Sequence, residues 1–464
     1  MAPGMNRRLF LGQALVVVFP LPARGVMAAP QDGFRILEAR EGKLRLLPEP
    51  ALPAAIWGYD GTVPGPLLRF KRGEEVKIRL VNKLPQPTSL TWHGVRISNP
   101  LDGVAGLTQE PVPPGGTFDY RFTPPDSGFY WYHPQVLPFF GEQLARGLYG
   151  AMIIDEPEPP VADRDMLVIL GDWDLDGKGQ IKEFATQAAA IRADATDHKP
   201  LVTVNARAVP VEEVLPPSSR LRLRIVNACS KHMVIVFAGL APIVLAIDSQ
   251  PCEAFAPAKN RIPLGPGARF DVMADLPNDP GADARLSLFG DDEVNRVLLF
   301  FKTAGNRRSP LPAISSLPPN PLLPTRIKLE SSQRFNIGIE PVASAESQTA
   351  PVPQDQQAFF TLNGKRYDGL AEPPLFSAKR GTPLMLGFTN RTKIIQAVHV
   401  HGHAMRLLND LDDGWEPYWR DTLLLAEGKT KHVAFVADNP GKWAVECFMA
   451  GQQVRGMATW FQVT

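Results

Sequence analysis

The stretch Gln396-Ala397-Val398-His399-Val400-His401-Gly402-His403, near the C-terminal end, decides the fold. Three of the chain's eight histidines stand here at every second position. Because side chains alternate between the two faces of a strand, a β-strand over this stretch would direct His399, His401 and His403 to one face. Imidazoles at this spacing suit two neighbouring metal ions better than one. A polar face at the end of a sheet is the plainer interpretation, but the pattern favours a metal site.

The composition is typical of an all-β protein with many turns. The chain has 464 residues, enough for two to four domains, and its 47 prolines are about twice the usual share of ~5%. The net charge of +1 gives no indication of nucleic-acid binding or of a membrane-binding surface. Three cysteines exclude a disulfide-rich scaffold. Cys229 and Cys252 could pair in an oxidising compartment, which leaves Cys447 over.

Residues 1–29 are predicted to be a twin-arginine signal peptide. Arg7 and Arg8 precede Phe10, Leu11 and a short apolar run, and small residues at 26–29 offer cleavage sites. This apolar run is too short to cross a bilayer, and no later run reaches ~18 apolar residues. We therefore expect a soluble periplasmic protein without a transmembrane segment.

The rest of the sequence contains three copies of one pattern. Each copy has a proline-rich lead, an alternating strand and a terminal asparagine, at residues 65–82, 215–227 and 373–390. Each copy also contains a later glycine turn, at residues 114–120, 265–271 and 426–430. Units of roughly 130 residues with short alternating strands and regular turn signals predict three consecutive β-sandwich domains.

Shifts in composition set the predicted domain bounds. The first unit covers 30–157, the second 158–306 and the third 326–464, and a proline-rich linker at 307–325 joins the last two. The polar segment 340–357 is predicted to be a loop within the third unit.

Four short motifs lie where the first and third units place their histidines: Thr91-Trp92-His93-Gly94, Trp131-Tyr132-His133-Pro134-Gln135, the stretch 396–403, and Trp443 to Phe448. With these motifs, and with segments 102–116, 120–124, 148–154 and Asp421-Thr422, the chain resembles the multicopper oxidases of the laccase type over its whole mature length. The resemblance implies three cupredoxin-like Greek-key domains. It also implies four histidine-rich motifs, two in the first domain and two in the third, which build a blue copper and a trinuclear copper cluster.

The resemblance is incomplete at the blue copper. Such a site takes two imidazoles, a thiolate and a weak axial thioether. When the family's ligand positions are carried over one by one, this chain retains Cys447 and Met457. Gln396 and Gln452 stand at the two positions where the family has imidazoles. Because an amide is a poor copper ligand, we expect Cys447 and Met457 to be remnants that hold no copper.

The trinuclear positions are half retained. The resemblance assigns eight of them, occupied here by His93, His133, His399, His401, Thr91, Gln135, Glu446 and Phe448. Four imidazoles and the Glu446 carboxylate could hold one zinc, copper or iron ion. In the alternative, the imidazoles hydrogen-bond to one another, to Gln135 and to water in a metal-free pocket. His403 follows the ligands in the family motif and is not expected to be one.

These substitutions favour a non-catalytic function. The chain is similar to the exported, copper-less member of this superfamily that stabilises the bacterial cell-division machinery. The leading hypothesis is therefore a periplasmic binding or scaffold protein with an unidentified protein partner. The alternatives are a copper-dependent oxidoreductase with fewer metals and a metal-binding or storage protein. Elemental analysis and a visible spectrum would separate these hypotheses.

Overall fold

The structure is a computed structural model that describes residues 32–184, 200–290, 296–309, 311–341, 360–364, 370, 373–408, 414–447 and 458–464. The predicted signal peptide, Phe448, Gln452 and Met457 lie outside these residues. Strands dominate the described part, which confirms the all-β prediction. Its helices are short: α1 (Phe140–Ala145), and the 3-10 helices η1 (Asn99–Leu101), η2 (Ala258–Asn260) and η3 (Leu329–Ser331). None of the described helices is long and apolar enough to cross a membrane.

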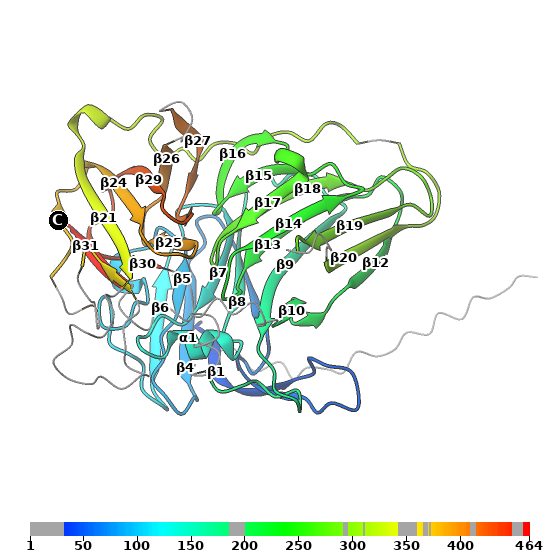
Figure 1. Cartoon of the computed structure of the whole chain (residues 1–464), viewed down its shortest axis with the longest axis horizontal. Coiled ribbons are helices and arrows are strands. Elements are labelled where there is room, and N and C mark those ends of the chain that lie inside the picture. The colour runs from blue at the N-terminus through cyan, green and yellow to red at the C-terminus, as the bar shows by residue number, and fades with distance from the viewer. Residues whose placement is uncertain are drawn as a thin grey trace, which may run out of the picture.

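The strands form six sheets, and each sheet takes its strands from one predicted unit (Figure 1). The first unit has the order β2 (Ala54–Tyr59), β1 (Arg35–Leu44), β4 (Val76–Asn82), β6 (Thr117–Phe122). Its second sheet has the order β3 (Gly65–Lys71), β8 (Gly150–Asp155), β7 (Gly128–His133), β5 (Thr91–His93). The residue bounds of the units themselves remain a prediction.

The second and third units also have two sheets each. In the second unit, one sheet runs β11 (Arg207–Ala208), β10 (Leu201–Val204), β9 (Arg164–Trp173), β13 (Arg220–Asn227), β18 (Arg269–Asp275), β15 (Ile243–Ile247), β16 (Gln250–Phe255). The other runs β12 (Val211–Leu215), β20 (Arg296–Thr303), β19 (Asp283–Leu288), β14 (Met233–Ala238), β17 (Arg261–Leu264).

The third unit follows the same plan. Its first sheet runs β22 (Phe360–Leu362), β21 (Gln333–Pro341), β24 (Pro383–Asn390), β29 (Thr430–Val436), β26 (Met405–Leu408), β27 (Trp415–Arg420). Its second sheet runs β23 (Ser377–Ala378), β31 (Ala458–Val463), β30 (Gly441–Cys447), β25 (Gln396–Val400), β28 (Thr422–Leu425).

The repeated sequence pattern corresponds to a repeated corner of the fold. The strands β4, β13 and β24 each pair in parallel with an earlier strand and antiparallel with a later one. Each ends at a fully buried asparagine, Asn82, Asn227 or Asn390. In all three, Nδ2 donates to two backbone carbonyls at 2.8–3.0 Å, and Oδ1 accepts the N–H two residues later at 2.9 Å. The buried amide therefore satisfies the loop that follows each strand.

The glycine turns complete these corners. The asparagine carbonyls accept N–H groups at 2.7, 2.8 and 2.9 Å from Gly115, Gly267 and Gly428 respectively. These glycines have φ values of 76°, 83° and 67°, a left-handed conformation that other residues adopt only at a cost. The predicted glycine turns are thus the second half of the corner that each asparagine begins.

Each unit has its own apolar core, and one further cluster joins the first two units. Phe129 and Trp131 of β7 pack in that cluster with Trp173 and Val226 of the second unit. The segment that connects the second unit to the third crosses the top of the molecule in Figure 1 and passes over both units. Its Asn320 donates to Asp126 at 2.7 Å and to Gln250 at 2.9 Å, which ties the connection to both earlier units.

The cysteines are buried thiols. Cys229 and Cys252 both lie in the core of the second unit and do not form the disulfide that an oxidising compartment would permit. Burial raises the pKa of the Cys252 thiol to about 12. Cys447 is also a buried thiol outside any disulfide, at the end of β30.

Candidate functional site

The predicted site residues lie at the ends of strands in the first and third units. On the third unit, β25 pairs with both β30 and β28, so that His399 stands opposite Glu446 on one side and Thr422 on the other. On the first unit, β5 and β7 pair so that Thr91 stands opposite His133. All of these side chains are buried.

The strand in the opening stretch is shorter than predicted. β25 ends at Val400, and the chain then turns through Gly402, whose φ is 68°. His403 therefore leaves the face shared by His399 and His401. Its ring packs against Phe435, Trp443 and Phe461 in the core of the third unit. Burial lowers the pKa of His403 to about 4, so this imidazole is neutral at pH 7.

Three of the predicted histidines form a compact group. The rings of His93 and His399 stack with centroids 3.8 Å apart. His93 Nδ1 lies 3.1 Å from His133 Nε2, and His133 Nδ1 lies 2.8 Å from the Pro134 carbonyl. Since a carbonyl only accepts, His133 donates from Nδ1 and accepts the His93 proton at Nε2. Burial lowers the pKa of His133 to about 3 and that of His93 well below its ordinary value, so both are neutral.

The fourth histidine is held between two carboxylates. His401 Nδ1 lies 3.0 Å from Asp102 Oδ2, and its Nε2 lies 3.0 Å from Glu446 Oε1. Burial lowers its pKa, but Asp102 and Glu446 outweigh that effect and raise the pKa to about 10. Gln135 Nε2 donates to the second Glu446 oxygen at 2.5 Å. His401 is therefore an imidazolium at pH 7 that joins the first unit to the third.

A buried arginine of the second unit meets the same cluster. The Arg269 guanidinium donates to both oxygens of Asp421, at 2.7 and 2.6 Å. The backbone N–H of Arg269 donates to Asp248 Oδ1 at 2.9 Å. Asp248 also accepts the N–H groups of Asp421 at 3.2 Å and Thr422 at 3.1 Å. Burial raises the pKa of Asp421, but Arg269 reverses this and holds it well below the ordinary range. The group is thus an ion pair that links the second unit to the third.

One combination of described residues could hold a metal ion. Ligand atoms of His93, His399 and Asp421 lie within 4.8 Å of one another, and all three residues are buried. Two oxygens of the same cluster, Thr91 Oγ1 and Gln135 Oε1, have no hydrogen-bond partner among the described residues. The structure brings together the predicted set, which is His93, His133, His399, His401 and Glu446. It adds Asp421 to this set, and it pairs His401 with the carboxylates of Asp102 and Glu446.

Sequence reasoning missed the acidic and basic members of this cluster. Asp421 and Asp102 appeared only inside segments that carry the family resemblance, and Arg269 only inside a repeated turn. No spacing relates them to the histidines, because Asp102 is 299 positions from His401 and Arg269 is 152 positions from Asp421. The repeated asparagine corner was the available signal for Arg269, since it places the glycine turn beside the strand end.

The predicted remnant of the blue copper lies deeper in the third unit. Cys447 Sγ is 2.7 Å from Gln396 Oε1, and Gln396 Nε2 donates to Thr392 Oγ1 at 3.0 Å. The amide oxygen accepts the thiol proton, so this contact favours a protonated Cys447. Met457, predicted as the axial position, lies outside the described residues.

Comparison with known proteins defines the class. Residues 43–159 and 341–464 match two family models, each described as multicopper oxidase. The chain is 28% identical over 502 residues to Multicopper oxidase MmcO of Mycobacterium tuberculosis, which covers 98% of this chain and 96% of that protein. The solved multi-copper oxidase from Pseudomonas Thermotolerans is 28% identical with a TM-score of 0.81, covering 93% of this chain and 98% of its own. The solved multi-copper oxidase from Pseudomonas Parafulva is 29% identical with a TM-score of 0.78, and the match covers 93% of this chain and 100% of that one.

Paired sheets of cupredoxin type and a histidine cluster between the first and third units define a copper-oxidase fold. The chain belongs to the multicopper oxidase superfamily.

Proposed function

We propose that this protein is an exported multicopper-oxidase-fold protein with degenerate copper sites, and that it acts by binding a periplasmic protein partner as a scaffold. The observation that carries this proposal is the contact between Cys447 and Gln396. An oxidase of this family passes electrons from a blue copper, and such a copper requires two imidazoles beside the thiolate. An amide oxygen that accepts the thiol proton does not fit that requirement.

The buried polar cluster supports the same proposal. His401 has carboxylates at both ring nitrogens, and His133 has a carbonyl at one and His93 at the other. Buried polar groups that satisfy one another in this way stabilise a packed interface between units. The residues present therefore serve an architectural role better than a three-copper cluster, whose other four ligand positions are occupied by Thr91, Gln135, Glu446 and Phe448.

The N-terminal segment supports the proposed export, and the degenerate sites support the proposed partner. Residues 1–29 have the twin-arginine pattern, a route that carries folded proteins. A protein that keeps this three-unit fold without its redox centre retains a large surface for association. The relatives MmcO and the solved Pseudomonas proteins are named as oxidases, so the proposed role is a departure within the superfamily.

Copper content tests the proposal directly. The protein is purified from copper-supplemented cells, and its copper per chain, visible spectrum and oxygen uptake with a phenol or with cuprous ion are measured. We expect no intense thiolate-to-copper band and no oxygen uptake above background. The Pseudomonas Thermotolerans enzyme, prepared in parallel, serves as the positive control. A blue band, or copper near four per chain, would refute the proposal.

A genetic experiment tests the non-catalytic role. Any phenotype of a deletion strain should be rescued equally by the wild-type chain and by Cys447→Ala, provided that both reach the same folded level. Failure of a folded Cys447→Ala protein to rescue would indicate that the thiol is needed for chemistry.

A second candidate function is binding of a single metal ion by the residual pocket. The group of His93, His399 and Asp421, within 4.8 Å of one another, favours it. Imidazole and carboxylate ligands suit zinc, copper or iron, and the ion would supply Lewis-acid or redox chemistry there. One tightly held metal that is lost in the His399→Gln variant would favour this function over the scaffold.

A further inference from the structure

We propose that the cleft between the second and third units binds a small aromatic carboxylate. This cleft has a volume of about 340 Å³ and lies between strands β15–β18 and strands β26–β29. Its lining includes Thr422 and Asp248, but neither Gln396 nor Cys447. The inference goes beyond the proposed function, since His93, His399 and Asp421, which form the candidate metal group, do not line this cleft.

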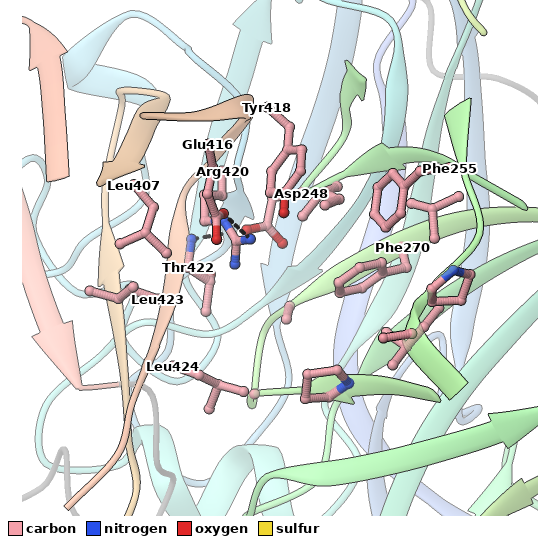
Figure 2. Close-up of a pocket in the computed structure, with 18 of the residues that line it drawn as sticks. Asp248, Phe255, Phe270, Leu407, Glu416, Tyr418, Arg420, Thr422, Leu423 and Leu424 are labelled. Carbon is pink, nitrogen blue, oxygen red and sulfur yellow. Dashed lines mark hydrogen bonds and ion pairs between the residues drawn. The ribbon is translucent and has the colours of Figure 1, made fainter. Parts of the chain in front are cut away.

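The two walls of the cleft are mainly apolar and come from different units (Figure 2). Phe255 and Phe270 of the second unit lie on one side, and Leu407, Leu423 and Leu424 of the third lie on the other. Tyr418 closes the cleft at one end, because its ring stacks on Phe255 with centroids 5.7 Å apart and planes inclined by 16°. A flat ring can pack against such a wall, since aromatic pairs favour offset-stacked or edge-to-face contacts.

The charged groups of the lining favour an anion. Three cations, Arg261, Arg420 and Lys431, face two carboxylates, Asp248 and Glu416. Both Asp248 oxygens already accept backbone N–H groups, and the buried Arg269 lies 3.6 Å from one of them. Arg269 thus offsets part of the Asp248 charge from behind the lining, and the lining itself carries three cations against two carboxylates.

Arg420 is the group best placed to bind a carboxylate. Its guanidinium lies beside Thr422 and Asp248 in Figure 2, 5.2 Å from the ring centroid of Tyr418. One terminal nitrogen donates to Glu416 Oε2 at 2.7 Å, and Nε is buried, so the terminal nitrogens are the ones that can reach a ligand. A guanidinium has five N–H donors, so Arg420 retains donors for a second, bidentate anion.

The size of the cleft sets the size of the ligand. A dry cavity of about 150 Å³ can hold benzene, so a cleft about twice as large suits a ring with one or two substituents. Larger drug-like molecules need pockets of up to about 1,000 Å³. One ring with one acid group therefore matches the volume, the aromatic wall and the positive charge together.

Isothermal titration calorimetry on the full chain tests the proposal, with benzoate as the probe. Three comparison ligands each change one feature: benzyl alcohol lacks the negative charge, acetate lacks the ring, and benzylamine reverses the charge. We expect benzoate to bind about tenfold or more tightly than any of the three, because only benzoate offers both features. Equal or tighter binding of benzylamine, or no benzoate binding at millimolar concentration, would overturn the proposal.

Two variants of the ion pair give opposite expected results. Arg420→Gln should weaken benzoate binding by about tenfold or more, because a charge-assisted bidentate contact is lost. Glu416→Gln should tighten it severalfold, because it removes the carboxylate that competes for Arg420. Benzoate affinity that is unchanged in Arg420→Gln, or weaker in Glu416→Gln, would contradict the assignment.

A matched control separates binding from folding. Arg79 is also a strand arginine with a carboxylate partner, Asp119 at 2.7 Å, but it lies on β4 of the first unit. Arg79→Gln should leave benzoate affinity unchanged. If Arg420→Gln does not fold, Glu416→Gln and the ligand series still decide the outcome.

Discussion

Arg269 is a buried charge at the interface between the second and third units. It is 1% exposed and donates to both Asp421 oxygens, while Asp248 lies on its other side. Removing one partner of a buried ion pair leaves the other charge uncompensated, which costs far more than the intact pair contributes. Two carboxylates would be left facing each other here.

We therefore expect Arg269→Met to lower the free energy of unfolding by about 3–5 kcal/mol. Urea unfolding measures this loss. Arg79→Met, which removes a partly exposed pair with Asp119, should cost only about 0–1 kcal/mol under the same conditions. Equal losses in the two variants would show that burial adds nothing to the Arg269 pair.

At the scale of single residues, the sequence predicted part of the candidate site. Alternation along 396–403 correctly placed His399 and His401 together but wrongly included His403, and the family resemblance indicated Gln396 beside Cys447. It could not show that Asp102 and Glu446 hold His401 from two sides, because those contacts arise from packing between units. Local spacing shows which way a side chain points, but not which charge from another unit meets it.

At the scale of secondary-structure elements, the turn after β25 decides where the histidines go. Gly402 has a φ of 68°, and a Cβ at this position would overlap the ring of Trp443. The sequence predicted a strand through His403, because the alternation of His399, His401 and His403 continues past the glycine. The strand ends at Val400 and the chain turns at Gly402 instead, and the close approach of Trp443 to this glycine has no local signature.

Gly402→Ala should lower the free energy of unfolding by about 2–4 kcal/mol, because it combines left-handed strain with overpacking. Gly428 is the matched control: it has a φ of 67°, and a Cβ added there would meet no atom within 4 Å, so Gly428→Ala should cost only about 1–2 kcal/mol. Thermal or urea unfolding compares the two. A similar loss in both variants would mean that contact with Trp443 is unimportant.

The repeated corners were the best-predicted elements. The sequence indicated strands that end at Asn82, Asn227 and Asn390, and all three do so with the same hydrogen bonds. Their prediction succeeded because strand, asparagine and glycine turn are close in sequence and obey local rules. The packing of one unit against another follows no such local rule.

For the molecule as a whole, the buried histidines predict a stability maximum near neutral pH. The pKa of His401 is raised to about 10, so its contribution is complete below its ordinary pKa of 6.5 and is lost as pH rises toward 10. The pKa values of His133 and His403 are lowered to about 3 and about 4, so their contributions are present above 6.5 and are lost as pH falls. Stability should therefore decline on both sides of about pH 6.5.

Urea unfolding between pH 4 and 10 measures this profile, over the range that the shifted pKa values span. In the His401→Gln variant the decline on the alkaline side should become shallower, while the acid side stays as in the wild type. An unchanged alkaline side would show that Asp102 and Glu446 do not hold a proton on His401.

The order of synthesis gives the Arg269 pair a further consequence. Domains are made and begin to fold from the N-terminus, so Arg269 emerges before Asp421, which follows 152 positions later. Until then the second unit can neutralise its guanidinium only with Asp248. The last unit to leave the ribosome thus supplies the carboxylate that binds both terminal nitrogens of Arg269, and an incomplete chain lacks this partner.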